Sequence, residues 1–173
     1  MIIIRRRIIN LEFLKILFIR RYTLELKWEE RLNTGVFCFD AEHRTILNML
    51  NFLRQLLLNK RREEAANFIV EILIPYLQSH LRHEEEVFEK FGYPEGETHT
   101  KSHQSLEKLF MGFIEPLREG EDKAIKHFQA VVIGWLYGHI EKTDKRYGAY
   151  FQEKNLLEKV NEIEPVKSEF TEV

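Results

Sequence analysis

Histidine and glutamate residues at four-residue spacing, within residues 80–103, constrain this chain more than any other feature. This stretch holds four of the seven histidines and three consecutive glutamates. His80 and Glu84 are four residues apart, and so are His99 and His103. Four residues advance an α-helix by about 400°, so each pair lies on one face of its helix. The two pairs can therefore converge on one metal ion or on two adjacent ions.

A glycine and proline segment separates the two pairs. Gly92 and Pro94 follow a run with helical periodicity, and Gly96 comes just beyond them. Glycine past the end of a helix, followed by proline, is a signal that the helix stops. We therefore expect two helices that fold back on one another, from about Glu63 to Phe91 and from about Glu97 to Leu117. Pro75 predicts a kink or a restart in the first of them.

Two further amphipathic helices are predicted, one on each side of this pair. The earlier one has Asp40 as a plausible N-cap and carries His43 at the start of an apolar face. The later one runs from about Glu121 to Phe151 and carries His139. Asp144 is five residues from His139, an offset of about 140° on an ideal helix. Both side chains can reach one site only if the carboxylate reaches sideways or the helix widens locally, as in a π-bulge.

These helices predict an all-α fold, an up-down-up-down four-helix bundle preceded by an extended N-terminal arm. The bundle covers residues 25–152 as one domain, and such bundles build their sites from inward side chains of facing helices. Each of the four helices contributes a histidine to its inner face. Histidines that pack in the core without a metal are the alternative, but buried imidazoles without partners are costly, and a pair of metal ions removes that cost.

Composition excludes some classes of function. The chain is 44% hydrophobic and 31% charged, which is ordinary for a globular protein in water. Its net charge of −2 gives no basic excess that would indicate nucleic-acid binding. The single cysteine, Cys38, has no internal disulfide partner and lies among apolar residues. It predicts a small buried side chain in a reducing compartment, which is the cytoplasm by default.

The two ends of the chain are predicted to lie outside the bundle. Residues 1–24 form a basic and aliphatic extension, in which Glu12 and Lys15 interrupt any run long enough to cross a bilayer. This extension could make weak contact with an anionic membrane surface through residues 1–21. We favour an appendage, because none of its residues has metal-ligand spacing. Residues 153–173 form a charged tail, and Pro165 argues against one continuous helix there.

Four motifs follow one another in an order that is specific. They are DAEH at 40–43, HLRHEE at 80–85, YPEGETHTKSH at 93–103 and WLYGHIEKTDKRY at 135–147. Together they resemble the successive motifs of the hemerythrin family, in particular its bacterial single-domain forms. The resemblance covers about residues 28–151. Seven positions in family order are far more specific than any single His-x-x-x-His pair.

The resemblance implies a non-haem centre of two iron ions, bridged by an oxide or hydroxide. It assigns one iron to His99, His103 and His139, the other to His43 and His80, and both to the bridging carboxylates of Glu84 and Asp144. The second iron then has five ligands and one open position for O2. The apolar wall that matches the family pocket is formed by Trp135, Leu136 and Ile140.

The remaining histidines and glutamates near these motifs match no ligand position. His83 is expected to be exposed, and His127 to lie at the surface or behind the ligands. Glu85 and Glu86 fall off the inward face of their helix, so we expect both to be solvated.

The function implied is reversible O2 binding for storage, delivery or sensing, with an O2-consuming enzyme as one recipient. No residue is placed as an obvious general acid or base, so we expect binding rather than catalysis. A di-iron oxidase or peroxidase of the ferritin-like kind is the first alternative, although that class uses Glu-x-x-His pairs, which this chain lacks. An iron-handling or iron-sensing module on the same fold is the second.

Overall fold

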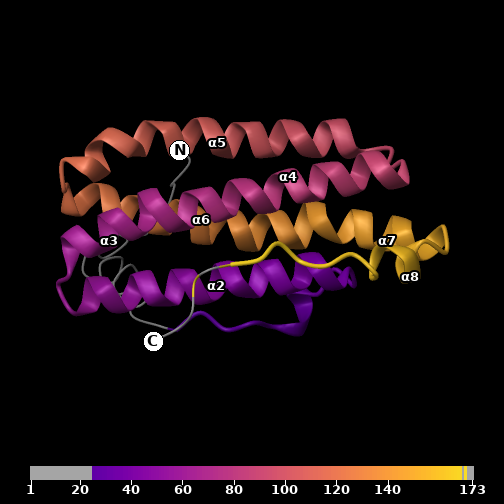
Figure 1. Cartoon of the computed structure of the whole chain (residues 1–173), viewed down its shortest axis with the longest axis horizontal. Coiled ribbons are helices and arrows are strands. Elements are labelled where there is room, and N and C mark those ends of the chain that lie inside the picture. Colours follow the sequence, from indigo (N-terminus) through magenta and orange to yellow (C-terminus); the bar gives the residue numbers. More distant parts are fainter. Residues whose placement is uncertain (1–24, 169, 171–173) are drawn as a thin grey trace, which may run out of the picture.

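Four antiparallel helical rods enclose the apolar faces that the sequence predicts, as the computed structural model of the chain shows (Figure 1). The structure describes residues 25–168 and residue 170. The first rod is α2 (Phe37–Leu58) and the third is α5 (Gly96–Arg118). The second joins α3 (Arg62–Phe68), the π-helical turn η2 (Ile69–Leu73) and α4 (Ile74–Phe91). The fourth joins α6 (Asp122–His139), the π-helical turn η3 (Ile140–Asp144) and α7 (Lys145–Glu153).

This arrangement confirms the predicted all-α, up-down-up-down bundle. Within the described residues there is no strand, and no helix there is both long and apolar enough to cross a membrane. The predicted extension at residues 1–24, with its proposed lipid contact, lies outside the part of the chain that the structure describes.

Glycines with a left-handed backbone conformation end the second and third rods. Gly92 ends α4 with φ 67°, and Gly120 follows α5 with φ 73°. After Gly92, the N–H of Tyr93 donates to the carbonyl of Phe88 at 2.9 Å, which satisfies one of the last free carbonyls of α4. The helix end predicted from Gly92 is therefore confirmed, and the third rod ends at Arg118, close to the predicted Leu117.

Asp40 does not cap the first rod, so that prediction was wrong. Helix α2 begins three residues earlier, at Phe37. From the first turn the Asp40 carboxylate reaches back and accepts hydrogen bonds from the N–H groups of Thr34 and Gly35, at 2.9 and 3.2 Å, and from the Thr34 hydroxyl at 2.8 Å. A short acidic side chain can bind loop N–H groups from within the helix as well as from its cap position, which spacing alone does not distinguish.

Pro75 is accommodated without a break in the second rod. Proline lacks an N–H and clashes with the carbonyl four residues earlier in a regular α-helix. Here the π-helical turn η2 ends at Leu73, directly before α4, and Pro75 lies in the first turn of α4. The predicted kink or restart therefore takes the form of a widened turn.

Two apolar clusters fill the bundle, with buried polar side chains where they meet. The larger cluster contains core leucines and aromatics such as Leu50 and Phe128, and the smaller one contains Phe39, Phe88 and Tyr147. Phe39 contacts the ring of His80 at a centroid distance of 6.4 Å, and Phe88 contacts that of His99 at 4.8 Å. The candidate ligands therefore lie at the boundary between the two clusters.

An arm and a tail flank the bundle along α2. In the arm, Trp28 stacks on His43 with ring centroids 6.4 Å apart, and a short 3-10 turn, η1 (Glu30–Leu32), leads into α2. After α7, a short helix, α8 (Leu157–Val160), reverses the chain. The following residues run back along the bundle, as the yellow segment in Figure 1 shows. Val160 is fully buried, so the described part of the tail packs against the fold.

Gly148 on α7 allows the closest approach of the arm to the bundle. A Cβ at this position would lie 2.0 Å from the backbone carbonyl oxygen of Thr34. We expect Gly148→Ala to lower the free energy of unfolding by about 1–3 kcal/mol or more, because backbone atoms must move to relieve the overlap. Chemical denaturation followed by circular dichroism measures the change.

Gly112→Ala is the matched control for that substitution. Gly112 is exposed in α5, and nothing lies within 4 Å of an added Cβ. Alanine there should stabilise the helix by about 0.5–1 kcal/mol. A Gly148→Ala protein as stable as the wild type would contradict the packing of the arm on α7.

Candidate metal centre

The seven side chains that the sequence singles out converge in the middle of the bundle. None is more than 6% exposed. Atoms that can bind a metal lie within 4.8 Å of one another in two groups. One group contains Glu84, His99, His103 and His139, and the other contains His43, His80 and Glu84. Asp144 is fully buried between them.

Three histidines on one side point their Nε2 atoms at a common point. The Nε2 atoms of His99 and His139 are 2.9 Å apart, and those of His103 and His139 are 3.3 Å apart. Three nitrogens bound to one ion at right angles, with metal–nitrogen bonds of about 2.1 Å, would be about 3.0 Å apart. Two neutral imidazoles at such a distance can share an N–H···N hydrogen bond, whereas three nitrogens that each keep an inward lone pair need a cation between them. The spacing therefore suits three ligands of a single ion.

Two histidines form the opposite side. The rings of His43 and His80 have centroids 4.6 Å apart. Their Nε2 atoms lie 3.9 and 3.8 Å from the same oxygen, Glu84 Oε1. Because both nitrogens point at one carboxylate oxygen from different helices, a cation between them would have three ligands at once.

Each of the two carboxylates divides its oxygens between the two sides. Glu84 directs Oε1 toward His43 and His80, and Oε2 toward His99 and His103 at 3.4 and 3.2 Å. Asp144 directs Oδ2 toward His43 at 3.4 Å. Its Oδ1 lies 3.3 Å from His99 Nε2 and 3.0 Å from His139 Nε2. Two carboxylates with this orientation are suited to bridge two ions.

A π-helical turn brings Asp144 into the site. The turn η3 covers Ile140–Asp144 and begins directly after His139. Five residues make about one turn of a π-helix, so His139 and Asp144 come onto the same face. This is the local widening that the five-residue spacing requires.

Hydrogen bonds behind the histidines fix the orientation of three rings. His80 Nδ1 is 2.6 Å from Glu42 Oε2, and His103 Nδ1 is 2.9 Å from Glu85 Oε1. His139 Nδ1 is 3.3 Å from the hydroxyl of Ser102. A carboxylate behind Nδ1 holds the proton on that nitrogen and leaves the Nε2 lone pair for a metal. These partners are the residues that sequence reasoning missed.

Two sequence expectations about neighbouring residues were wrong. His83 is only 14% exposed, because its Nδ1 lies 2.7 Å from Glu42 Oε1. Glu85 is 31% exposed but turns toward His103 rather than wholly into solvent. His127 and Glu86 are exposed, as expected. Glu42 directly precedes His43 in the DAEH motif, and its position beside a ligand was the available signal.

Burial and opposite charge act against each other in this centre. Burial lowers the pKa of His43 to about 4, with His80 adding to the effect, so His43 is neutral at neutral pH. Burial also disfavours the charged form of His99, but the nearby carboxylates of Asp144 and Glu84 outweigh it and raise its pKa to about 9. Burial opposes ionisation of Glu84, yet the neighbouring histidines hold its pKa well below the usual value. The carboxylates are therefore charged, and the centre favours a cation.

Buried atoms without hydrogen-bond partners show that the residues fit a metal. Among the described residues, Glu84 Oε2 and both oxygens of Asp144 accept no hydrogen bond. A buried carboxylate oxygen without a partner costs on the order of several kcal/mol. A bound cation or a hydrogen-bond donor removes that cost. Imidazole and carboxylate ligands suit iron, manganese or zinc.

Of the three residues predicted to form an apolar wall, Trp135 contacts a candidate ligand. It stacks on His139 with ring centroids 4.1 Å apart and an interplanar angle of 17°. Leu136 is 1% exposed, and Ile140 at the start of η3 is fully buried. Trp135 therefore covers the ring of His139, and the other two residues lie in the apolar interior of the same rod.

Comparison with known families decides the assignment of the chain. The model of the "Hemerythrin HHE cation binding domain" matches residues 34–151. The chain belongs to the hemerythrin family. Its resemblance to that family, first based on the order of four motifs, is thereby confirmed. The match contains all seven converging side chains and leaves residues 1–33 and 152–173, including the whole tail, outside it.

Relatives of this hemerythrin-family chain cover most of the bundle. It is 31% identical over 122 residues to the bacteriohemerythrin of Stenotrophomonas maltophilia, covering 70% of this chain and 78% of that protein. It is 30% identical to the bacteriohemerythrin of Methylococcus capsulatus, over 66% of this chain and 87% of the other. A myohemerythrin of Theromyzon tessulatum is 24% identical over 70% and 89% of the two chains.

Solved hemerythrin structures share the fold of this chain. Crystal structures of hemerythrin variants in which one leucine is replaced by tyrosine or alanine superpose with a TM-score of 0.66 at 28% identity. The match covers 72% of this chain and 95% of each of those chains.

Glu84→Ala tests the central carboxylate. This substitution removes one oxygen from each side of the cluster, so the purified protein should retain well under half of the wild-type metal content. Glu86→Ala, on the exposed side of the same helix, should retain all of it. Elemental analysis of protein purified without added metal gives both values. A Glu84→Ala protein with wild-type metal content would contradict the geometry described here.

Proposed function

We propose that this chain binds O2 reversibly at a non-haem centre of two iron ions. The observation that carries the proposal is the division of the oxygens of Glu84 and Asp144 between two groups of histidines. A single ion would need only one side of this arrangement. Two ions held between both carboxylates would use the three oxygens of Glu84 and Asp144 that have no hydrogen-bond partner.

The two proposed ions would have different numbers of histidine ligands. One ion would be held by His99, His103 and His139, and the other by His43 and His80, with Glu84 and Asp144 shared. With a bridging oxide or hydroxide, the ion beside His43 and His80 would have one ligand fewer and would keep an open position for a small molecule. O2 is the small molecule that a redox-active iron pair binds, and the pair would supply the electrons for it.

The protein's own residues make such binding reversible by positioning and by excluding water. Glu42, Glu85 and Ser102 keep the Nε2 atoms of three histidines directed inward. The Tyr147 hydroxyl donates to Glu84 Oε1 at 2.9 Å and holds that carboxylate between the two sides. Trp135, Leu136 and Ile140 form an apolar wall that limits access of water and reductants.

Several features favour binding over catalysis. The ligand set has five imidazoles and two carboxylates, whereas ferritin-like oxidases use more carboxylates than imidazoles. The relatives are named bacteriohemerythrins and a myohemerythrin. Storage of O2 and delivery to an O2-consuming enzyme both suit a chain whose family match covers nearly the whole bundle. A reducing compartment such as the cytoplasm suits its lone, fully buried Cys38.

Cycling the reduced protein between air and an O2-free atmosphere tests the proposal. We expect a visible absorption band that appears on exposure to air and vanishes when O2 is removed, over several cycles. Reversal is expected because the buried centre excludes water and reductants. Rapid oxidation that argon does not reverse would contradict O2 carriage and would favour an oxidase, a peroxidase or an iron-handling module.

Leu136→Tyr tests the apolar wall. The larger side chain and its hydroxyl should crowd the buried space beside His139, so the rate of autoxidation of the O2-bound protein should change severalfold. Stopped-flow and slow absorbance measurements give this rate. Leu109→Tyr, on the exposed part of α5, is the control. Equal autoxidation rates in wild-type and Leu136→Tyr proteins would place the binding pocket elsewhere.

A further inference from the structure

A buried carboxylate, Glu42 on α2, joins the metal centre to the C-terminal tail. Glu42 is fully buried and accepts three hydrogen bonds. His80 Nδ1 lies 2.6 Å from Oε2, His83 Nδ1 lies 2.7 Å from Oε1, and the N–H of Val166 donates to Oε1 at 2.9 Å. Val166 lies beyond residues 34–151, the part matched by the family model. One carboxylate therefore contacts a candidate ligand and the tail at the same time.

The tail is anchored on both sides of Val166. Before it, Asn161 Oδ1 accepts a hydrogen bond from the N–H of Phe37 at 2.8 Å. After it, Phe170 packs against Phe52 and Phe68, with centroid distances of 5.3 and 5.5 Å. Figure 1 shows the tail returning along the bundle in yellow. The tail is thus positioned to hold Val166 against Glu42.

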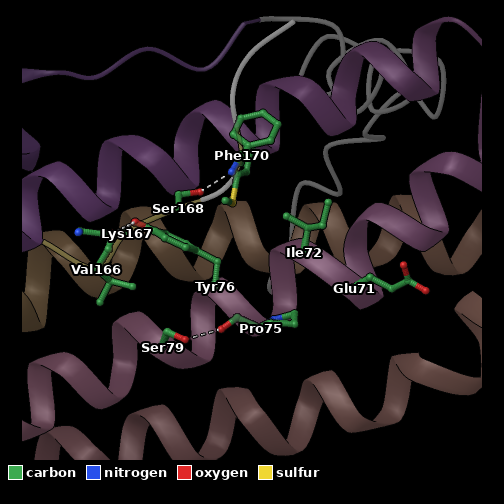
Figure 2. A pocket seen from close by; sticks show the side chains of 10 residues that line it. Glu71, Ile72, Pro75, Tyr76, Ser79, Val166, Lys167, Ser168 and Phe170 are labelled. Atoms are coloured by element: carbon green, nitrogen blue, oxygen red, sulfur yellow. Dashed lines mark hydrogen bonds between the residues drawn. The ribbon is translucent and has the colours of Figure 1, made fainter.

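Both backbone groups of Val166 form hydrogen bonds to side chains of the bundle. Its N–H donates to Glu42, and its carbonyl accepts from the Tyr76 hydroxyl at 3.5 Å. Figure 2 shows Tyr76 of α4 directed toward this residue. A cavity of about 370 Å³ lies next to this contact, between the tail and α4. The tail therefore rests on a few defined contacts at this point rather than on a continuous seal.

Through Glu42, the tail constrains the orientation of the His80 ring. His83 and Val166 both bind Oε1, so the carboxylate cannot rotate and its Oε2 stays on His80 Nδ1. A hydrogen bond from N–H to a charged carboxylate is stronger than a neutral one. Burial works against ionisation of Glu42, but the hydrogen bonds from His80 and His83 outweigh it and lower its pKa. His80 in turn directs Nε2 at Glu84.

The opposite side of the centre is supported by other elements. His103 is backed by Glu85 of α4, and His139 by Ser102 of α5 and Trp135 of α6. The hydrogen bond from the tail to Glu42 reaches only the side that contains His43 and His80. Loss of that contact should therefore affect the two sides unequally.

We propose that residues 161–168 form a positioning strap that acts through Glu42 on His80 and controls retention of the metal on the His43 and His80 side alone. This inference rests on the proposed two-metal centre. In the proposed centre the open position for O2 would be on that same side, so docking of the strap would also set how firmly the O2-binding ion is held. Glu42 and Val166 are positioning residues, since they act on the metal through His80.

Val166→Pro removes the hydrogen bond without removing the tail. Proline has no N–H, whereas the rest of the strap is unchanged. Lys167→Pro is the matched control, because no hydrogen bond from the Lys167 N–H is found within the described part of the chain. Each protein is loaded with Fe²⁺ under argon and then challenged with excess chelator. Metal per chain is followed with time, and circular dichroism checks the fold.

The expected result is release in two unequal phases. In Val166→Pro, one metal per chain should leave severalfold faster than in wild type, but by less than the about 10–100-fold effect of removing the hydrogen-bond partner of a ligand histidine itself, because Glu42 remains beside His80. The second metal should leave at the wild-type rate, and Lys167→Pro should match wild type in both phases. Wild-type kinetics in Val166→Pro, or equal acceleration of both metals, would overturn the inference.

Glu42→Gln separates a positioning role from general loss of packing. Glutamine has the same shape, but its NH2 group must face either His80 or the pair of donors from His83 and Val166, so one set of bonds is lost. The double variant with Val166→Pro should release the first metal no faster than Glu42→Gln alone, because the strap acts through this carboxylate. Additive acceleration would show a separate route and contradict the strap. A wild-type protein that binds fewer than two metals would instead overturn the proposed function itself.

Discussion

Two carboxylates buried inside an apolar bundle, Glu84 and Asp144, set the requirements that the rest of the structure meets. Ionised groups in such surroundings are costly unless opposite charge and hydrogen bonds compensate them. Here five histidines surround them, one from α2, one from α4, two from α5 and one at the end of α6. The four antiparallel rods are what bring these residues to one level of the bundle. The proposed pair of metal ions would complete the charge balance.

The fourth rod departs locally from regular α-helical geometry, and this brings Asp144 into the centre. The π-helical turn η3 rotates Asp144 onto the face of His139, at the cost of regular helical hydrogen bonding. Gly148, one turn further along α7, lets the backbone of Thr34 approach closely and so brings the arm over His43 through Trp28. The histidines are in turn held by Glu42, Glu85 and Ser102. The metal centre, its supporting hydrogen bonds and the tail thus form one connected network.

Much of this could be predicted from the sequence, because helical period fixes which residues share a face. The spacing of His80 and Glu84, and of His99 and His103, required inward positions once the helices were assigned. The five-residue spacing of His139 and Asp144 pointed to a widened turn. The order of motifs then identified the family. These inferences are local along the chain, and local geometry is what periodicity describes.

The remainder depends on contacts between distant segments, which periodicity does not describe. Glu42 meets His83 and Val166, 41 and 124 residues away in the sequence. Glu85 does not lie on the inward face of its own helix, yet His103 of the next helix contacts it. Asp40 was misassigned because its carboxylate binds the N–H groups of Thr34 and Gly35, which precede the helix, whereas an N-cap side chain binds N–H groups in the first turn.

Anomalous diffraction at the iron edge, from crystals of protein purified without added metal, is the sharpest test of the proposed two-iron centre. We expect two iron peaks between Glu84 and Asp144, one beside the Nε2 atoms of His43 and His80, and one beside those of His99, His103 and His139. A single peak, or no iron at this level of the bundle, would contradict it.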